Sequence, residues 1–308
     1  MAGMTLDQLR IFLAVAEYLH FTRAAEVLYI TQPAVSAAVQ SLEEQYKVKL
    51  FNRINRHIEI TEAGKLLQKE AQKILDQVIL TERGLRELNN LQRGELKLGS
   101  SLTIGNYWLP EKISQFQRQY PNISVNCTLA NTEEICVGTA TGLFDLGLVE
   151  GEVQPSLKSV LEEEIVGSDR LQIVVGKSHP WFERKVIFLT ELYTTAWVMR
   201  EPGSGTQQRF EEALLNWRVD LSQLNVILVL SSGEMVKAVV ETGAAATAIS
   251  ELMVEKEIQL STLRPIPVLD NRQDDWASTE IIRPFLKLKH RQRFQTRLSV
   301  AFEKMLTQ

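Results

Sequence analysis

Cysteine and histidine are scarce in this chain. Cys127 and Cys136 are its two cysteines among 308 residues, and its four histidines are scattered. Two cysteines provide neither a disulfide framework nor a zinc site, and no pair of histidines has the spacing of metal ligands. The sequence therefore predicts no metal, no cofactor and a reducing compartment.

A long hydrophobic run and an excess of positive charge are also missing. Asp7, Arg10 and Glu17 interrupt the apolar residues near the start of the chain, a pattern typical of neither a signal peptide nor a membrane span. We therefore expect a cytoplasmic protein with no membrane partner. Because 34 Lys and Arg residues stand against 38 Asp and Glu residues, the net charge is −4, and any DNA-binding face must be local.

The first segment of the chain is predicted to be helical. It follows the 3.6-residue period of helices, and a capping box of Thr5 and Gln8 marks the start of a first helix. We expect Thr22 to cap a short second helix and Thr31 to cap a third, in whose first turn Pro33 is tolerated. Two helices separated by a three-residue turn predict a helix-turn-helix.

The third predicted helix has one apolar face and one small polar face. Val35, Val39 and Leu42 recur at helical spacing and are expected to pack inward. The opposite face carries Gln32, Ser36, Ala37 and Gln40. This second face is free to contact a partner.

A basic segment follows this helix. Residues 47–57 contain no acid and carry Lys47, Lys49, Arg53, Arg56 and His57. The alternating residues 58–60 then favour a strand. We interpret the segment as a basic wing or hairpin.

A long helix is predicted from Thr61 to about Arg93, with Gly94 as the residue that ends it. Its apolar side recurs at spacings of four and three residues, formed by Leu67, Ala71, Ile74, Val78, Thr81, Leu85 and Leu88. A heptad seam of this kind predicts self-association as a coiled coil.

After Gly94, short apolar runs alternate with helical stretches. The runs lie at 96–100, 123–129, 146–149, 171–175, 197–199, 226–230 and 245–249. This alternation predicts α/β units with mostly parallel strands, arranged as two smaller sheets joined by crossovers. We interpret the basic stretch 287–297 as the solvated face of a final helix that turns Phe294, Leu298 and Phe302 inward.

Several motifs occur in a fixed order along the chain. They are Phe-Thr-Arg-Ala-Ala-Glu at 21–26, Thr-Gln-Pro-Ala-Val-Ser at 31–36, Leu-Glu at 42–43, Leu-Phe-Asn-Arg at 50–53 and Thr-Glu-Ala-Gly at 61–64. Together they resemble the winged-helix domain of LysR-type transcriptional regulators. Further stretches, at 105–110, 116–121, 144–147 and 200–206, resemble the effector domain of the same family. The loop at 200–206, together with residues 103–107, resembles the corresponding segments of regulators of inorganic nutrient assimilation. Such regulators control, for example, carbon fixation, nitrogen or sulfur genes.

The resemblance implies a fold and an assembly. It implies a winged helix-turn-helix at 1–60, a coiled-coil linker helix at 61–93 and a two-lobed, periplasmic-binding-protein-like α/β effector domain at 94–308. Its two subdomains are expected at 94–165 with 270–308 and at 166–269. The implied partners are double-stranded promoter DNA, a small-molecule effector, RNA polymerase and further copies of the chain, as a homodimer and usually a tetramer.

DNA contacts are expected on the third helix and the wing. Gln32 offers a carboxamide that pairs with adenine N6 and N7 in the major groove. Ser36 is expected on a phosphate or base edge and Ala37 on a thymine methyl, with helix packing as the alternative explanation for both. The full expected set is Thr22, Arg23, Thr31, Gln32, Pro33, Ser36, Ala37, Gln40, Arg53 and Arg56.

Small hydroxyl side chains mark an expected effector site. Gly-Ser-Gly-Thr at 203–206 precedes a helix, so Ser204 and Thr206 are expected to hold an anionic or strongly polar ligand at its N-terminus. The alternative explanation for Ser204 is an ordinary helix cap. Ser101 and Thr103 follow the first strand of the effector region, where open α/β sheets bind ligands. The full expected set is Ser101, Thr103, Asn131, Ser204, Thr206 and Thr247.

No motif favours catalysis. Pro202 and Thr206 flank Ser204 where a nucleophile elbow needs glycine, and the loop lacks the lysine of a Walker motif. We therefore interpret the protein as a non-enzymatic transcription regulator that a co-inducer controls from a site between two α/β subdomains. The alternative is a solute-binding or enzymatic α/β protein whose N-terminal helices form only a dimerisation arm.

Overall fold

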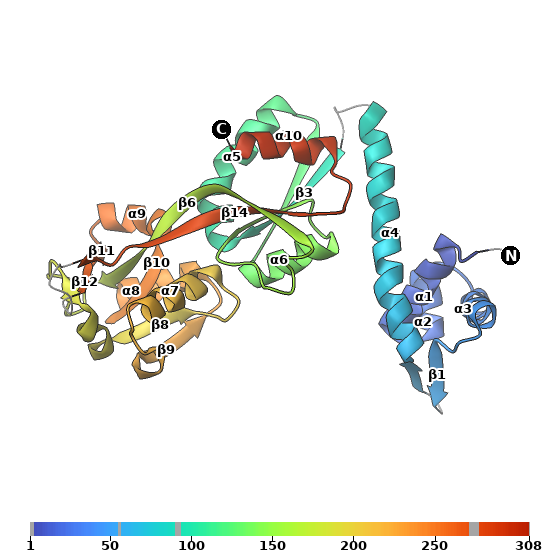
Figure 1. Ribbon diagram of the computed structural model, residues 1–308, viewed down its shortest axis with the longest axis horizontal. Coiled ribbons are helices and arrows are strands. Elements are labelled where there is room, and N and C mark those ends of the chain that lie inside the picture. The colour runs from blue at the N-terminus through green and yellow to red at the C-terminus, as the bar shows by residue number, and fades with distance from the viewer. Residues whose placement is uncertain (1–2, 55–56, 90–93, 271–276, 308) are drawn as a thin grey trace. The chain divides into compact units, whose positions relative to one another are not determined.

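The computed structural model describes residues 3–54, 57–89, 94–270 and 277–307. The chain forms two compact units, Met1–Arg86 and Glu87–Gln308, each considered by itself (Figure 1). The first unit is mainly helical, and the second is built around a large β-sheet.

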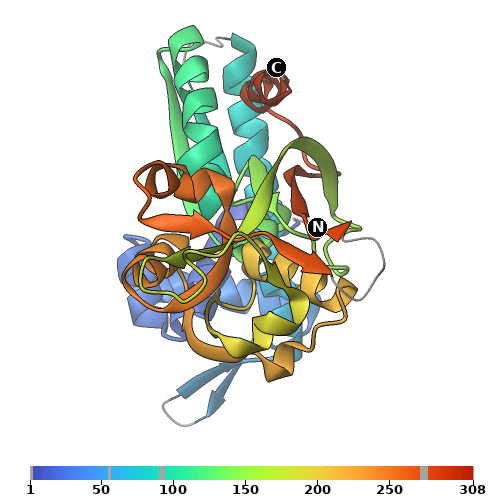
Figure 2. The ribbon, with the colours of Figure 1, turned by 90° about the vertical axis from the view of Figure 1, so that its left-hand side faces the viewer.

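The first unit contains the predicted helix-turn-helix and hairpin. Its elements are α1 (Leu6–Tyr18), α2 (Phe21–Val27), α3 (Gln32–Tyr46), β1 (Phe51–Ile54), β2 (His57–Ile60) and α4 (Glu62–Asn89). The helices enclose a core in which Phe12, Val35 and Leu42 are completely buried. β1 and β2 pair antiparallel and form a hairpin that projects from the helices (Figure 2). Both predictions are therefore confirmed.

Two of the predicted caps lie at their expected positions. Thr5 Oγ1 accepts a hydrogen bond from the N–H of Gln8 at 3.2 Å, and the N–H of Thr5 donates to Gln8 Oε1 at 2.9 Å, which confirms the capping box. Thr31 is the N-cap of α3 by its backbone conformation, but its side chain makes no capping hydrogen bond.

α2 does not start where the sequence indicated. It begins at Phe21, so Thr22 lies within its first turn and the prediction of a Thr22 cap is wrong. His20 is the N-cap, because its Nδ1 accepts a hydrogen bond from the N–H of Arg23 at 3.2 Å. Histidine is not among the side chains favoured at N-caps, so the residue pattern carried no signal for it.

α4 is one long helix, but its predicted seam has two different environments. Ala71 is completely buried in the core of the first unit, and Leu67 packs against the same core. Ile74 and Leu85 are 43% and 60% exposed, and the side chain of Leu88 lies outside the described part. The start of the seam therefore stabilises its own unit, and its exposed residues are available for the predicted self-association.

The prediction that Gly94 ends the long helix is wrong. Gly94 is the first residue of β3 (Gly94–Ser101). A Cβ added at Gly94 would lie 2.6 Å from Cδ1 of Leu298. The glycine therefore accommodates the close approach of the C-terminal helix, since a Cβ here would force the Leu298 side chain to shift.

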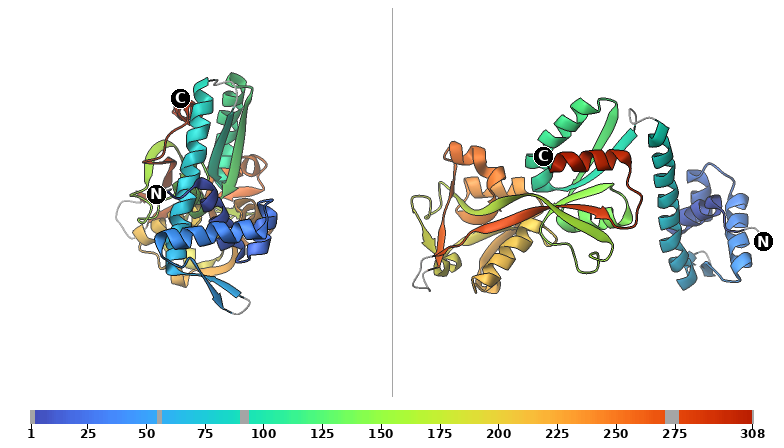
Figure 3. Two further views of the ribbon diagram at one scale, coloured as in Figure 1. Left: turned by 90° about the vertical axis from the view of Figure 1, so that its right-hand side faces the viewer. Right: turned by 45° about the horizontal axis from the view of Figure 1, so that its top comes forward.

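The second unit is built on one nine-stranded sheet. Its order is β4 (Ile123–Ala130), β3, β5 (Leu146–Glu150), β14 (Ile281–His290), β6 (Leu161–Gly176), β10 (Ala245–Ser250), β8 (Ala196–Arg200) and β9 (Asn225–Leu230), with β11 (Leu263–Pro265) paired to β6. The predicted apolar runs all lie in strands of this sheet. The prediction of two separate sheets is wrong, because β14 pairs with β6 along its whole length and joins the two halves (Figure 3).

The strands within each half of the sheet are parallel, whereas those at the junction between the halves are antiparallel. β3 runs parallel to β4 and β5, and β8 runs parallel to β9 and β10, as predicted. β6 and β14 are antiparallel to each other and to the strands beside them. These two long strands therefore form the crossovers that connect the halves.

Helices and short elements cover the sheet. They are α5 (Leu109–Gln119), α6 (Thr132–Thr141), α7 (Gly205–Asn216), α8 (Gly233–Thr242), α9 (Glu251–Gln259) and α10 (Arg297–Leu306), the π-helix η1 (Ile104–Trp108), the 3₁₀-helices η2 (Leu189–Thr194) and η3 (Leu221–Gln223), and a small sheet of β7 (Ile187–Phe188), β12 (Val268–Asp270) and β13 (Ala277–Ser278). One apolar core surrounds Phe116 and Phe302, and another surrounds Trp197 and Phe210. We call the parts around these cores the first lobe and the second lobe.

The C-terminal basic stretch is not the solvated face of a helix. Lys287 lies in β14, where it is buried and its Nζ is 2.5 Å from Oε2 of Glu164. Leu298 is completely buried in α10, as predicted, but Phe294 precedes the helix and is 51% exposed. The ion pair with Glu164 allows the charged Lys287 to be buried in a strand. The sequence analysis did not predict β14, because a basic residue interrupts its apolar pattern.

Candidate nucleic-acid interface and ligand cleft

α3 presents the predicted polar face. Val35, Val39 and Leu42 are buried on its other side. The polar face comprises Gln32, Pro33, Ala37 and Gln40, which are exposed, and Ser36, which is half-buried. Gln32 Nε2 donates a hydrogen bond to Ser36 Oγ at 2.8 Å, and Gln40 Nε2 donates to Glu44 Oε1 at 2.7 Å. Each carboxamide is therefore oriented by a neighbour one turn along the helix while it stays open to a partner.

α2 and the turn after it add further exposed groups. Thr22 and Arg23 are exposed in the first turn of α2, and the guanidinium of Arg23 lies 5.2 Å from the ring centroid of Tyr18. Tyr29, in the turn between α2 and α3, is 96% exposed and has a left-handed backbone with φ 55°. The sequence analysis missed Tyr29, although an aromatic residue in the turn of a helix-turn-helix was visible as a signal.

The wing is anchored to the core of the first unit. The ring of Phe51, at the start of β1, lies 5.4 Å from that of Phe12 and 6.1 Å from that of Phe21, centroid to centroid. Arg53 lies in β1 opposite Ile58. The side chain of Arg53 and the whole of Arg56 lie outside the described residues.

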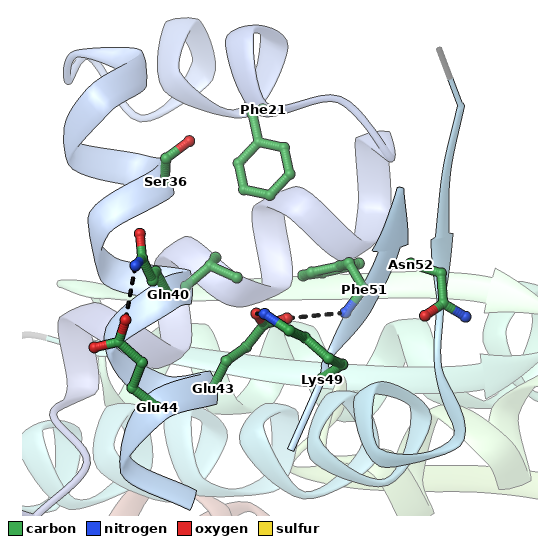
Figure 4. A pocket seen from close by; sticks show the side chains of 9 residues that line it. Phe21, Ser36, Gln40, Glu43, Glu44, Lys49, Phe51 and Asn52 are labelled. Carbon is green, nitrogen blue, oxygen red and sulfur yellow. Dashed lines mark hydrogen bonds and ion pairs between the residues drawn. The ribbon is translucent and has the colours of Figure 1, made fainter. Parts of the chain in front are cut away.

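A groove of about 510 Å³ lies between α3 and the wing (Figure 4). It is lined by Phe21, Ser36, Val39, Gln40, Glu43, Glu44, Lys49, Phe51 and Asn52. Gln40 and Glu44 stand on the α3 side, whereas Phe51 and Asn52 come from β1. The groove thus separates the two elements that are expected to contact DNA.

Glu43 connects these two elements. Its Oε1 accepts hydrogen bonds from the N–H groups of Leu50 at 2.8 Å and Phe51 at 3.3 Å, and its Oε2 lies 2.7 Å from Nζ of Lys49. Burial alone raises the pKa of this carboxyl, but the Lys49 ammonium and the two N–H groups outweigh it and hold the pKa below its ordinary value. The charge of Lys49 is therefore balanced within the protein, so Lys49 is a weaker phosphate ligand than the basic run indicated.

In the second unit, buried polar residues gather where strands end at the boundary between the lobes. Ser101 ends β3, Glu150 ends β5, Arg200 ends β8 and Ser250 ends β10, and all four are buried. Open α/β sheets bind ligands outside the carboxyl ends of their strands. We expect the effector to bind in this region, and we therefore call it the ligand cleft.

Ion pairs and hydrogen bonds link the groups in the ligand cleft. The guanidinium of Arg283, in β14, is completely buried and pairs with Asp169 of β6, with Nε–Oδ1 2.5 Å and Nη2–Oδ2 2.7 Å. Arg283 Nη1 donates to Thr206 Oγ1 at 2.9 Å and lies 3.4 Å from Glu150 Oε1. Ser250 Oγ donates to Asp169 Oδ2 at 2.5 Å. The crossover strands, the first lobe and the second lobe thus meet in one polar network.

The structure brings part of the expected effector set into this network. Ser101 donates a hydrogen bond to Glu150 Oε2, and Thr206 accepts one from Arg283. Thr103 is completely buried with its Oγ1 3.7 Å from Sδ of Met253, a residue of α9 in the second lobe. Thr247 is also buried, and its Oγ1 lies 3.5 Å from the carbonyl oxygen of Ala248.

Asn131 and Ser204 lie outside this network, and Ser204 lines a neighbouring pocket. Asn131 is the N-cap of α6, where its Oδ1 accepts from the N–H of Glu134 at 2.9 Å. Ser204 is the buried N-cap residue of α7, but its side chain makes no capping hydrogen bond. Ser204 lines a pocket of about 340 Å³ that also contains the carboxylates of Glu133, Glu152 and Glu211. These carboxylates disfavour the anion that was expected at Ser204.

A second contact joins the lobes on the side of η1. The hydroxyl of Tyr107 donates to Glu234 of α8, and burial together with this carboxylate raises the pKa of Tyr107 to about 12. Nζ of Lys237 lies 5.9 Å from the Tyr107 ring centroid and 2.9 Å from Oε1 of Glu257. The π-helix of the first lobe is thereby held to α8 of the second.

Other kinds of site find no support in the described part of the chain. No group of three or more His, Cys, Asp or Glu side chains there is placed to hold a metal ion. Burial raises the pKa of the Cys127 thiol to about 11 and that of Cys136 to about 12, so neither is a reactive thiolate near neutral pH. Among the described helices, none has the length and apolarity needed to cross a membrane.

Comparison with known protein families finds a matching family model for each of the two units. The model of bacterial regulatory helix-turn-helix proteins of the lysR family matches residues 6–65, and the model of the LysR substrate binding domain matches residues 89–306. The chain belongs to the LysR family. It is a LysR-type transcriptional regulator with a helix-turn-helix DNA-binding domain and an effector-binding domain. This confirms the resemblance and the predicted fold class, and it decides against the N-terminal helices being only a dimerisation arm.

LysR-family relatives of this chain include proteins named for carbon fixation. A "Probable RuBisCO transcriptional regulator" from Synechocystis sp. is 34% identical over 298 residues, which cover 97% of this chain and 84% of the relative. A protein of the same name from Cyanidium caldarium is 36% identical over 264 residues, which cover 86% of this chain and 83% of the relative. The similarity to nutrient-assimilation regulators is thereby confirmed.

Solved LysR-family structures share the fold. CbnR in complex with its target DNA has a TM-score of 0.67 and 21% identity, covering 98% of this chain and 99% of CbnR. The regulatory domain of Synechocystis CcmR in complex with 2-PG has a TM-score of 0.59 and 23% identity, covering 70% of this chain and 96% of that domain. At this level of identity the likeness shows the architecture.

Proposed function

We propose that this LysR-family protein regulates carbon-assimilation genes, with RuBisCO genes as its first target. The observation that carries the proposal is the 34% identity with the Synechocystis protein of that name, over 97% of the chain. The similarity includes the DNA-binding and the effector-binding domain, so it supports a common target class and a common kind of signal.

Promoter DNA is recognised by α3 and the wing. α3 lies in the major groove, where Gln32 pairs with adenine, Ser36 contacts a phosphate or base edge and Ala37 contacts a thymine methyl. The exposed polar face of α3 and the projecting hairpin support this arrangement. The proposed contacts are Thr22, Arg23, Thr31, Gln32, Pro33, Ser36, Ala37, Gln40, Arg53 and Arg56.

A small polar or anionic effector binds between two subdomains, 94–165 with 270–308 and 166–269. The hydroxyl groups at the strand ends and the 2-PG bound by the CcmR regulatory domain support this proposal. Its contacts are drawn from Ser101, Thr103, Asn131, Ser204, Thr206 and Thr247. The effector acts only if its affinity differs between two arrangements of the protein.

The regulator assembles as a homodimer through α4 and as a tetramer on DNA. It acts in the cytoplasm with RNA polymerase and performs no catalysis. The exposed seam residues Ile74 and Leu85 support self-association. The edge strand β9 supports it as well, since Val226, Ile227 and Val229 are exposed there and uncovered apolar edges favour pairing.

Binding to a RuBisCO promoter tests the proposed target. The purified protein is titrated onto the RuBisCO promoter of its own genome and onto a scrambled fragment of equal length and composition, at one salt concentration. The proposal predicts promoter binding about 10³-fold tighter or more. Equal affinity for the two fragments contradicts the proposed target.

A further inference from the structure

Glu150 occupies a position that is built to attract an anion. Its carboxylate is buried at the end of β5, where it accepts a hydrogen bond from Ser101 and lies 3.4 Å from Nη1 of Arg283. The backbone carbonyl of Glu150, and not its carboxylate, lies against the first residue of α7, because a Cβ added at Gly205 would lie 1.6 Å from that carbonyl oxygen. A hydroxyl and a guanidinium are both groups that bind carboxylates and phosphates.

The positive charge in the ligand cleft is already balanced. Arg283 makes two short contacts with Asp169, and Arg200, a second buried arginine at the strand ends, pairs with Glu201 at 2.8 and 2.9 Å. The single guanidinium of Arg283 therefore faces two carboxylates, those of Asp169 and Glu150. An anionic ligand that enters beside Ser101 and Thr206 meets a buried negative charge at close range, where repulsion is weakly screened.

We propose that the Glu150 carboxylate occupies the position beside Ser101 and Arg283 where an anionic group of a ligand would otherwise bind. It thereby sets the charge selectivity of the cleft. Highly charged anions bind only by displacing the Glu150 carboxylate from Ser101 and Arg283, so the cleft favours ligands of lower negative charge. The inference rests on the proposed effector site between the subdomains. It assigns Glu150 a role in specificity that the expected effector set did not include.

The network retains its main ion pair without the Glu150 charge. Asp169 holds Arg283 through two contacts, and Thr206 accepts from the third nitrogen of the guanidinium. In Glu150→Gln, the side-chain carbonyl oxygen can still accept from Ser101. This variant therefore removes the charge with little change in shape, and it is expected to fold.

The test is calorimetric titration of the full-length protein with 2-phosphoglycolate, a small ligand that carries a carboxylate and a phosphate. Glu150→Gln should bind this probe at least tenfold more tightly than the wild type, which corresponds to about 1.4 kcal/mol. Glu150→Asp keeps the charge and should show no gain. Glu111→Gln removes an exposed carboxylate of α5, outside the ligand cleft and the neighbouring pocket, with the same change in net charge, and should remain within about threefold of the wild type.

Each outcome has one meaning. Equal or weaker binding by Glu150→Gln, while the wild type binds the probe, overturns the role of Glu150 and leaves the proposed effector site intact. No binding by any of the proteins contradicts both the inference and the anionic part of the proposed function. If melting curves show that Glu150→Gln is unfolded, Glu150→Ala takes its place, and a gain in affinity is again required.

Discussion

Gln32 is the residue on which sequence specificity is expected to depend most. Its carboxamide is exposed in the first turn of α3 and is oriented by Ser36. Gln32→Ala removes the bidentate partner of an adenine, so it should weaken binding to the cognate promoter by about 1 to 3 kcal/mol and leave binding to random DNA unchanged. Competition titrations on both DNAs at one salt concentration measure the two effects.

Gln45→Ala is the matched control for this experiment. Gln45 is exposed in the last turn of the same helix, away from the predicted contact face. Its replacement should leave both affinities as they are. A Gln32→Ala variant that loses the same affinity on specific and random DNA would show that Gln32 serves only in phosphate binding or folding.

Glu43 is expected to contribute to the stability of the first unit through the wing. Glu43→Gln weakens the charge-assisted bonds to Lys49 and to the N–H groups of Leu50 and Phe51, at a cost of about 1 kcal/mol in free energy of unfolding. Because the folded-state pKa is below the ordinary value of 4.5, this stability is present above pH 4.5 and is lost as the pH falls through the lowered pKa.

Melting curves near neutral pH and in acid measure this effect. The wild type should exceed Glu43→Gln in melting temperature near neutral pH, and the two should converge in acid. Glu44→Gln is the control, since Glu44 is exposed and accepts from Gln40 within α3. A gap between wild type and Glu43→Gln that persists below the lowered pKa would contradict the assigned role of the Glu43 charge.

Ser204 separates the two explanations given for the loop before α7. As an effector contact, Ser204→Ala should cost about 1 to 3 kcal/mol of effector affinity and leave DNA binding without effector intact. As a helix cap, it should instead lower fold stability by about 0.5 to 2 kcal/mol. Because the side chain makes no capping hydrogen bond, we expect an unchanged melting temperature and a reduced transcriptional response. The reverse pattern would remove Ser204 from the effector site.

At the scale of elements, α4 is the helix whose exposed apolar seam predicts association. Leu85→Asp places a charge in the predicted contact between helices, where burial of each Leu or Ile contributes roughly 1.5 to 3 kcal/mol. Sedimentation at micromolar concentration should show a dimer or larger species for the wild type and a shift toward monomer for Leu85→Asp. Gln77→Asp adds the same charge at an exposed position off the seam and should not dissociate the protein. A wild-type monomer would refute self-association.

The elements that the sequence revealed are those whose burial follows a local pattern. The inward face of α3 repeats at helical spacing, and the apolar runs in β3, β5, β8 and β10 are largely buried. β14 was missed because Arg283 and Lys287 interrupt it, and both are buried only through partners far away in sequence. The joining of two sheets into one depends on the same strand, so it could not be read from local patterns either.

At the scale of the whole molecule, the candidate sites differ in how much the sequence discloses. The expected DNA-binding face lies on α2, α3 and one hairpin, which are consecutive in the sequence, so residue spacing and the family resemblance indicated its residues. The ligand cleft combines Ser101, Glu150, Asp169 and Arg283 from four strands. Hydroxyl groups at strand ends were predictable, but charged residues in separate strands become partners only through the sheet order, which nothing in their local sequence encodes.

The whole chain carries a net charge of −4, so we expect attraction of DNA to depend on local cationic groups and on specific contacts rather than on overall charge. Footprinting on promoter DNA is therefore the most direct test of the central claim, that α3 and the wing recognise a specific sequence. The account predicts protection of a defined promoter site by the wild type and its loss in Gln32→Ala, at protein concentrations that leave random DNA unprotected. Protection that spreads uniformly along all DNA, or none at any concentration, would contradict it.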